Sequence, residues 1–153
     1  MRMLTIAVAL TSILSAATGA FAQDNPTTFR EITGNPAAAA AFKAMAEGHR
    51  LPDWIHGKTV ESPGHEIMFD GAKFYVMSAC KQHDCGSERI AVMYDPGKEI
   101  MYGLLSSVDQ QTVSEKLTWL NIGLGSEAID GRTILYAALT GSLENHPDAF
   151  DYK

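Results

Sequence analysis

A single stretch decides the fold: KFYVMSACKQHDCGSERIAVMY, residues 73–94. Residues 73–78 and 89–94 are rich in apolar, aromatic and β-branched side chains, which is typical of strands. Between them, Cys80 and Cys85 are the only two cysteines of the chain. The pattern predicts a hairpin whose loop is flanked by two cysteines and carries His83 at its tip.

The beginning of the chain predicts export. Arg2 is followed by an apolar run over residues 3–14 and then by small residues that end in an Ala-x-Ala site at residues 20–22. A basic start, a short apolar core and an Ala-x-Ala site are the parts of a secretory signal peptide. We therefore expect residues 1–22 to be removed and residues 23–153 to form a single domain in the periplasm.

In an oxidising compartment two thiols this close are expected to pair, so the sequence predicts a Cys80–Cys85 disulfide. By chain entropy, a ring of about six residues stabilises a fold by only ~2 kcal/mol, so its main effect is on local shape. Two other interpretations stay open. Cys80, His83 and Cys85 could hold a metal ion, although such crowded ligands depart from the usual zinc spacings. They could also form a redox site, although Cys-x4-Cys differs from the Cys-x-x-Cys of thioredoxin-like proteins.

Composition and motifs narrow the function. Removing the signal peptide removes Arg2 and leaves 11 basic against 18 acidic residues, a net charge of −7. This charge disfavours nucleic acid and anionic membrane surfaces as partners and favours a cationic partner. No Gly-x-Ser-x-Gly, phosphate-binding glycine loop or His-Glu-x-x-His motif occurs. We therefore expect a protein that is not an enzyme and uses no cofactor.

The remaining periodicities predict an α+β fold. Asn35-Pro36 is a typical helix start and Gly48 a typical stop, so a helix is expected between them. Asp70-Gly71 suits a two-residue β-turn. Strands are expected at 66–69, 73–78, 89–94, 99–106 and around 117–119, a second helix at 128–139, and an irregular end at 140–153. The sum is a mainly antiparallel β-sheet with helices packed on one face and a loop protruding between two strands.

Three segments resemble the Ivy family, the periplasmic inhibitors of vertebrate lysozyme. They are CKQHDCGSERIAVM at residues 80–93, LTWLN at residues 117–121 and ALTGSLENHP at residues 138–147. The resemblance extends over roughly residues 37–153, and the cysteine loop is specific to the family. This chain carries Gln82 where the family loop has proline. Losing the fixed φ of proline is expected to loosen the free loop and to lower its affinity.

The resemblance implies that the protein inhibits c-type lysozyme, the lysozyme of animals. The residues of its inhibitory loop would be Cys80, Lys81, Gln82, His83, Asp84 and Cys85. His83 would enter the lysozyme cleft and lie between the two catalytic carboxyl groups. An alternative keeps the loop but directs it at the bacterium's own lytic transglycosylases, where it would control autolysis. The sequence leaves open whether the protein is a monomer or a homodimer.

Overall fold

The computed structural model describes residues 25–150 and residue 152. The expected signal peptide, residues 1–22, lies outside the described residues. None of the helices within the described part of the chain is long and apolar enough to span a membrane.

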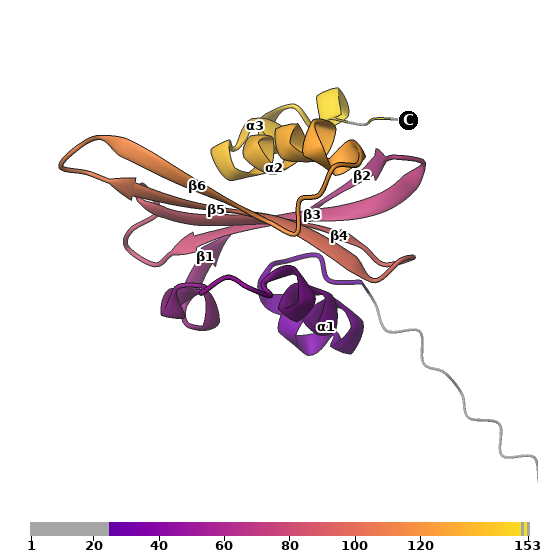
Figure 1. The fold of residues 1–153 in the computed structure, drawn as a ribbon, viewed down its shortest axis with the longest axis horizontal. Helices are drawn as coiled ribbons and strands as arrows, with labels where there is room; N and C mark the ends of the chain where they lie inside the picture. The colour runs from indigo at the N-terminus through magenta and orange to yellow at the C-terminus, as the bar shows by residue number, and fades with distance from the viewer. Residues whose placement is uncertain (1–24, 151, 153) are drawn as a thin grey trace, which may run out of the picture.

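One antiparallel sheet of six strands forms the centre of the described part of the chain (Figure 1). The strands are β1 (Thr59–Glu61), β2 (His65–Phe69), β3 (Ala72–Lys81), β4 (Glu88–Asp95), β5 (Ile100–Asp109) and β6 (Ser114–Leu120). The order along the sheet is β1, β3, β4, β5, β6, and β2 pairs with the other end of β3 beside β1. The predicted strands and hairpins are confirmed. The short strand β1, which extends the pairing of β3 next to the cysteines, was not predicted.

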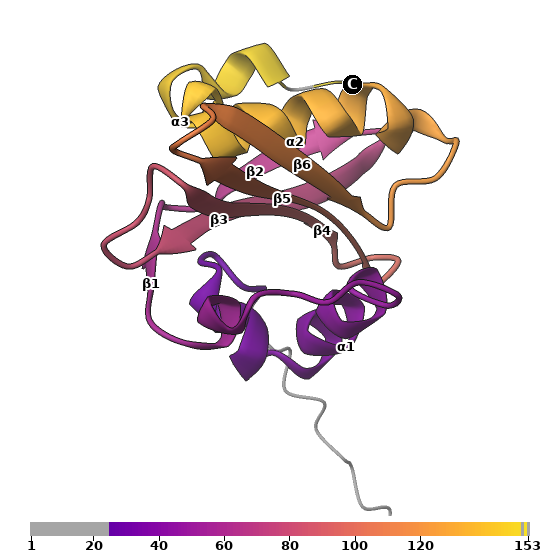
Figure 2. The same ribbon diagram turned by 60° about the vertical axis from the view of Figure 1, so that its left-hand side comes forward.

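Helices cover both faces of this sheet. They are α1 (Pro36–Met45), α2 (Asp130–Thr140) and α3 (Ser142–Asn145). Figures 1 and 2 show α1 against one face, and α2 and α3 against the opposite face. The α+β class is confirmed, but the helices are not confined to one face as expected.

Strand β4 explains why both faces are covered. Its side chains alternate, so that Ile90, Val92 and Tyr94 join the core beneath α1, whereas Ala91 and Met93 join the core beneath α2. All five are at most 1% exposed. A strand that is apolar on both faces needs a covering layer on each side. The unbroken apolar run of residues 90–94 was therefore the signal for a two-sided sheet.

The first helix begins where the sequence predicts, and it ends at Met45, with a turn over residues 46–48 that reaches Gly48. The Asn35 side chain accepts a hydrogen bond of 2.9 Å from the backbone N–H of Ala38, and Pro36 occupies the first helical position. Gly48 follows the helix with φ of 79°. Gly103 on β5 lets this helix approach the sheet closely, because a Cβ there would lie 2.7 Å from Sδ of Met45.

The C-terminal segment, which was expected to be irregular, and the start of the domain are both ordered. The C-terminal part forms α3 and a 3-10 turn at Pro147–Phe150, which corrects the expectation for residues 140–153. Hydrogen bonds fix the start of the domain, where the carboxylate of Glu31 accepts from the backbone N–H groups of Thr27 and Thr28. In addition, the Thr27 carbonyl accepts from Gly64 N–H at 2.9 Å. The predicted Asp70-Gly71 turn is confirmed, since both residues have positive φ, at 52° and 70°.

Candidate functional site

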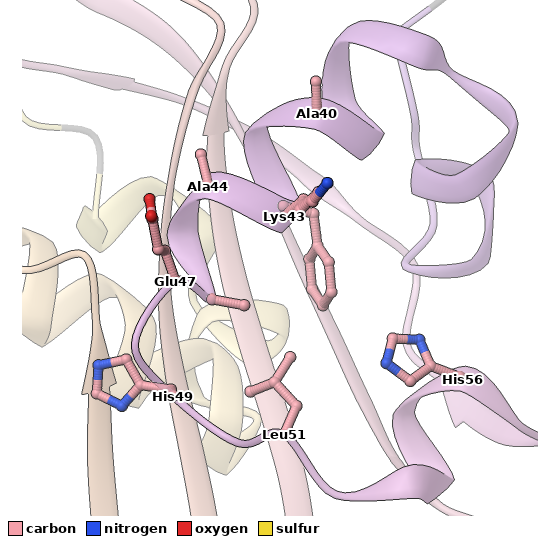
Figure 3. Close-up of a pocket in the computed structure, with 9 residues that line it drawn as sticks. Ala40, Lys43, Ala44, Glu47, His49, Leu51 and His56 are labelled. Carbon is pink, nitrogen blue, oxygen red and sulfur yellow. The ribbon is translucent and has the colours of Figure 1, made fainter.

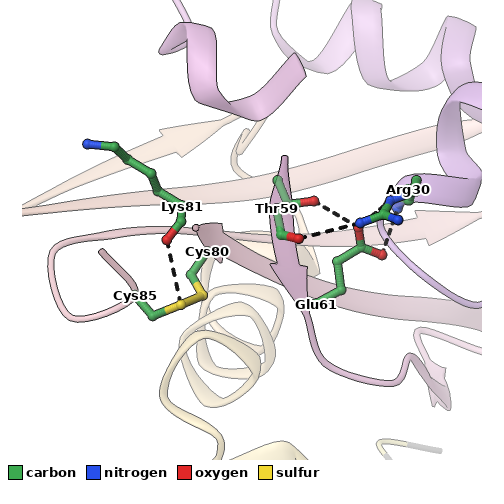
Figure 4. Close-up of a disulfide and its surroundings, with 6 residues drawn as sticks. All are labelled: Arg30, Thr59, Glu61, Cys80, Lys81 and Cys85. Atoms are coloured by element: carbon green, nitrogen blue, oxygen red, sulfur yellow. Dashed lines mark hydrogen bonds and ion pairs between the residues drawn. A yellow bond between two sulfur atoms is a disulfide. The ribbon is translucent and has the colours of Figure 1, made fainter. Parts of the chain in front are cut away.

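The cysteine loop, residues 80–85, leaves the end of the sheet between β3 and β4. Cys80 and Cys85 form a disulfide, with their Cα atoms 4.8 Å apart (Figure 4). Cys80 pairs with Val60 of β1 on one side and with Arg89 of β4 on the other. The first cysteine of the ring is therefore held within a three-stranded part of the sheet. The predicted disulfide and the protruding loop are confirmed.

Backbone hydrogen bonds shape the tip of the loop. The N–H of Asp84 donates to the carbonyl of Lys81 at 2.9 Å. The carbonyl of Asp84 in turn accepts from the N–H groups of Ser87 and Glu88, at 3.1 and 3.0 Å. His83 lies within this turn, with φ of 67° and an exposed side chain. The imidazole thus stands at the outermost part of a loop whose backbone is already folded.

Two charged side chains of the loop pair with each other. Nζ of Lys81 lies 3.1 Å from Oδ2 of Asp84, and both side chains are partly exposed. The hydrogen bond from Lys81, followed by one from Ser87, lowers the pKa of the Asp84 carboxyl below its ordinary value. Asp84 is therefore a carboxylate at neutral pH, and the Lys81–Asp84 pair leaves the loop tip without net charge apart from His83.

The sulfur of Cys85 lies 3.7 Å from the carbonyl oxygen of Lys81, the approach drawn as a dashed line in Figure 4. A disulfide sulfur has no hydrogen to donate, so this approach is a van der Waals contact. It fills the inside of the ring between the disulfide and the backbone.

The carboxylate of Glu88 anchors the base of the loop to two other segments. Its Oε2 accepts from Nε1 of Trp54 at 3.2 Å, and its Oε1 accepts from Oγ of Ser107 at 3.0 Å. Trp54 packs against the core beneath α1. The residue that begins β4 is therefore joined both to the 3-10 turn Asp53–His56 and to β5.

Ser87 joins the loop to the β5–β6 hairpin. Its carbonyl accepts from the N–H of Val108 at 2.8 Å, and its hydroxyl accepts from Nε2 of Gln110 at 2.6 Å. Ser87 is only 6% exposed, so these bonds are largely shielded from water. The sequence carried no signal for Gln110, which lies more than twenty positions away and follows no motif.

On the other side of the loop, Arg30 fixes strand β1. Its Nε lies 3.2 Å from Oε1 of Glu61, and its terminal nitrogen donates to the carbonyl of Thr59 (Figure 4). Thr59 is the residue that pairs with Lys81. The loop is therefore braced from β1 on one flank and from the β5–β6 hairpin on the other.

A shallow hollow lies away from the loop, over the outer side of α1. Its volume is about 700 Å³, and its lining is mostly apolar and includes Phe42 and Leu51. Figure 3 shows His49 and His56 on opposite sides of Leu51. Within residues 25–150 and 152, no three histidine, cysteine or acidic side chains come together as a metal-binding group. The polar residues that line the hollow are Lys43, Glu47, His49 and His56.

The disulfide also bears on the metal and redox interpretations of Cys80, His83 and Cys85. A metal ion is bound by thiolates, and both sulfurs are already bonded to each other. In this state the two cysteines supply neither ligands nor a free thiol.

Fold and site together define a class: small α+β domains that present one braced, disulfide-closed loop at the end of an antiparallel sheet. The family model described as "Inhibitor of vertebrate lysozyme (Ivy)" matches residues 37–141. The chain therefore belongs to the Ivy family, which confirms the resemblance seen in its sequence.

Two relatives show the extent of the similarity. A protein of Escherichia coli K12 named "Inhibitor of vertebrate lysozyme" is 46% identical over 147 residues, which cover 96% of this chain and 92% of the relative. A protein of the same name from Pseudomonas aeruginosa is 30% identical over 92 residues, or 59% of this chain and 60% of the relative.

Proposed function

We propose that this protein inhibits c-type lysozyme by inserting its cysteine loop into the active-site cleft, with His83 between the two catalytic carboxyl groups. The observation that carries the proposal is the exposed imidazole of His83 at the tip of a loop closed by a disulfide and braced on both flanks. The names of the relatives support the target, because a protein 46% identical over 147 residues is named for the inhibition of vertebrate lysozyme.

The chemistry of the target suits this side chain. Lysozyme is the type case of a retaining glycosidase, with two carboxyl groups about 5 Å apart, one protonated and one ionised. An imidazole between them can donate to the ionised carboxylate through one nitrogen and accept from the protonated acid through the other. In its charged form it would donate to both and add a charge-assisted attraction in a partly desolvated cleft.

Because the free loop is already ordered, it loses less conformational entropy when it binds. A loop that must be fixed on association loses conformational entropy, and this loss subtracts from affinity. Here the disulfide, the Lys81–Asp84 pair and the bonds to the Asp84 carbonyl fix the loop beforehand. Gln82, in place of the family's proline, is exposed and removes one such restraint.

Charge and location fit the same proposal. A domain of net charge −7 after loss of Arg2 is attracted to a basic lysozyme over long range, which raises the association rate at low salt. A signal peptide at residues 1–22 would deliver residues 23–153 to the periplasm, where disulfides form and where lysozyme reaches the peptidoglycan.

The test is a lysis assay with the purified domain of residues 23–153 and a vertebrate c-type lysozyme. We expect stoichiometric inhibition that weakens as salt is raised from about 50 to 500 mM, because the Debye length shrinks several-fold over that range. Full lysozyme activity at a tenfold excess of the domain would refute the proposal. The same titration against a bacterial lytic transglycosylase measures whether an endogenous muramidase is also a target.

A further inference from the structure

Val113, at the tip of the β5–β6 hairpin, is an apolar residue whose exposure does not serve the fold. Its side chain is 86% exposed, so it contributes almost nothing to a core. Its φ is 52°, in the left-handed region, which a β-branched residue rarely adopts. The turn between β4 and β5 has the same form, with hydrogen bonds to Asp95 Oδ1 and a φ of 51° at Glu99, so the left-handed conformation belongs to the turn and the unusual feature is a valine in that position.

The turn that presents Val113 is ordered by its own hydrogen bonds. Oδ1 of Asp109 accepts from the N–H groups of Gln111 and Thr112, at 2.8 and 3.2 Å. The hydroxyl groups of Thr112 and Ser114 lie 2.7 Å apart. The two backbone bonds lower the pKa of the Asp109 carboxyl, so that it carries a negative charge at neutral pH. The tip therefore offers one fixed apolar side chain beside one fixed negative charge.

This turn and the cysteine loop lie at the same end of the sheet. Glu88, the first residue of β4, pairs with Ser107, and the β5–β6 hairpin continues only a few residues further to its turn. The bonds of Ser87 to Val108 and Gln110 join the two projections at their bases. In Figure 1 both project from the left end of the sheet.

A six-residue loop is too small to account for a stable complex by itself. Specific protein–protein interfaces bury about 800 Å² per partner and involve roughly 20 residues on each side. Surface next to the loop must therefore contact the target as well. The β5–β6 turn lies next to the loop at this end of the sheet and exposes an apolar side chain. Because its own hydrogen bonds already order this turn, binding would lose little conformational entropy there.

We propose that Val113 is a second contact of the inhibitory surface and packs on the rim of the lysozyme cleft while the cysteine loop occupies the cleft. Asp109, beside it, faces basic groups of the lysozyme surface. This inference rests on the proposed inhibition of lysozyme, and it identifies the β5–β6 tip as a determinant of affinity and of preference among lysozymes.

Two variants of Val113 and one matched control test the inference. Val113→Gly removes the side chain and relieves the left-handed backbone, and Val113→Lys replaces an apolar contact by a charge that a basic partner repels. Leu124→Ser is the control, because Leu124 is 101% exposed and follows the end of β6 at the opposite end of the sheet. The inhibition constant for a vertebrate c-type lysozyme and the melting temperature are measured for all three.

For Val113→Gly we expect the inhibition constant to rise about fivefold, the effect of losing one modest apolar contact. Val113→Lys should raise it further. The melting temperature of Val113→Gly should equal or exceed that of the wild type, since glycine accepts positive φ without a steric cost. Leu124→Ser should inhibit as the wild type does.

Unchanged inhibition by both Val113 variants would overturn the inference, as would an equal loss in Leu124→Ser. A lower melting temperature for Val113→Gly would contradict the premise that the valine side chain does not serve the fold. These outcomes differ from failure of the proposed function, in which the wild-type domain itself would not inhibit lysozyme.

Discussion

The hydroxyl of Ser87 and the side-chain amide of Gln110 are joined by a hydrogen bond of 2.6 Å, and it connects the base of the cysteine loop to the neighbouring hairpin. The two residues are 23 positions apart in sequence. A double-mutant cycle with Ser87→Ala and Gln110→Ala should give a coupling free energy of unfolding near 1 kcal/mol, typical of a shielded neutral hydrogen bond. Denaturant titration of the four proteins measures it. A coupling energy indistinguishable from zero would show that the bond does not brace the loop.

His83→Ala tests the proposed anchor. A central polar side chain that enters a pocket of the partner is typically a hot spot, so the binding free energy should weaken by at least ~2 kcal/mol, about 30-fold in the inhibition constant. The melting temperature should stay the same, because His83 is exposed and serves no core. His146→Ala, at another exposed histidine, is the control and should inhibit normally. An unchanged inhibition constant for His83→Ala removes this residue from the mechanism.

Replacement of both cysteines by serine separates stability from preorganisation. The double variant Cys80→Ser/Cys85→Ser should fold, because a ring of about six residues contributes only ~2 kcal/mol to the free energy of unfolding. Its inhibition should nevertheless fall several-fold, since the loop must then be ordered on binding. Circular dichroism and the lysis assay measure the two properties. Inhibition equal to that of the wild type would mean that the disulfide does not preorganise the loop.

The Lys81–Asp84 ion pair predicts how the stability of the folded loop changes with pH. The pKa of Asp84 is lowered first by the hydrogen bond from Lys81, so the pair stabilises the folded loop above the carboxyl's ordinary pKa of about 4. This contribution is lost as pH falls through the lowered value. Lys81→Met should raise the pKa of Asp84 toward the ordinary range, which carboxyl NMR can follow.

Asp109 provides an internal control for that titration. Its pKa is lowered by backbone bonds from Gln111 and Thr112, and Lys81 is not among the causes. It should therefore titrate identically in the wild type and in Lys81→Met. A shift of Asp109 together with Asp84 would indicate a general change of the domain and not the loss of one ion pair.

Sequence reasoning succeeded where the signal was local. The turn at Asp70-Gly71, the helix start at Asn35 and the pairing of Cys80 with Cys85 each depend on a few adjacent residues, and the structure confirms all three. It failed where distant segments meet. No local pattern places α1 and α2 on opposite faces, although the two-sided strand β4 carried part of that information.

The sequence also did not predict which residues contact the base of the loop. Trp54, Ser107 and Gln110 converge on residues 87–88 only because β3, β4 and β5 lie side by side. Each is an ordinary polar or aromatic residue in its own segment. Their common role emerges from the register of the sheet, which hydrophobic periodicity does not determine.

The cysteine loop emerges from β3 and β4, each of which has paired neighbours on both sides. Interior strands of this kind open only when the whole domain unfolds, so their amides should exchange with solvent as slowly as any in the molecule. The tip residues 82–83, by contrast, are exposed. The exposed residues proposed to bind the target are therefore distinct from the strands that hold them, and other short sequences could be grafted between Cys80 and Cys85 to make binders for different clefts on the same scaffold.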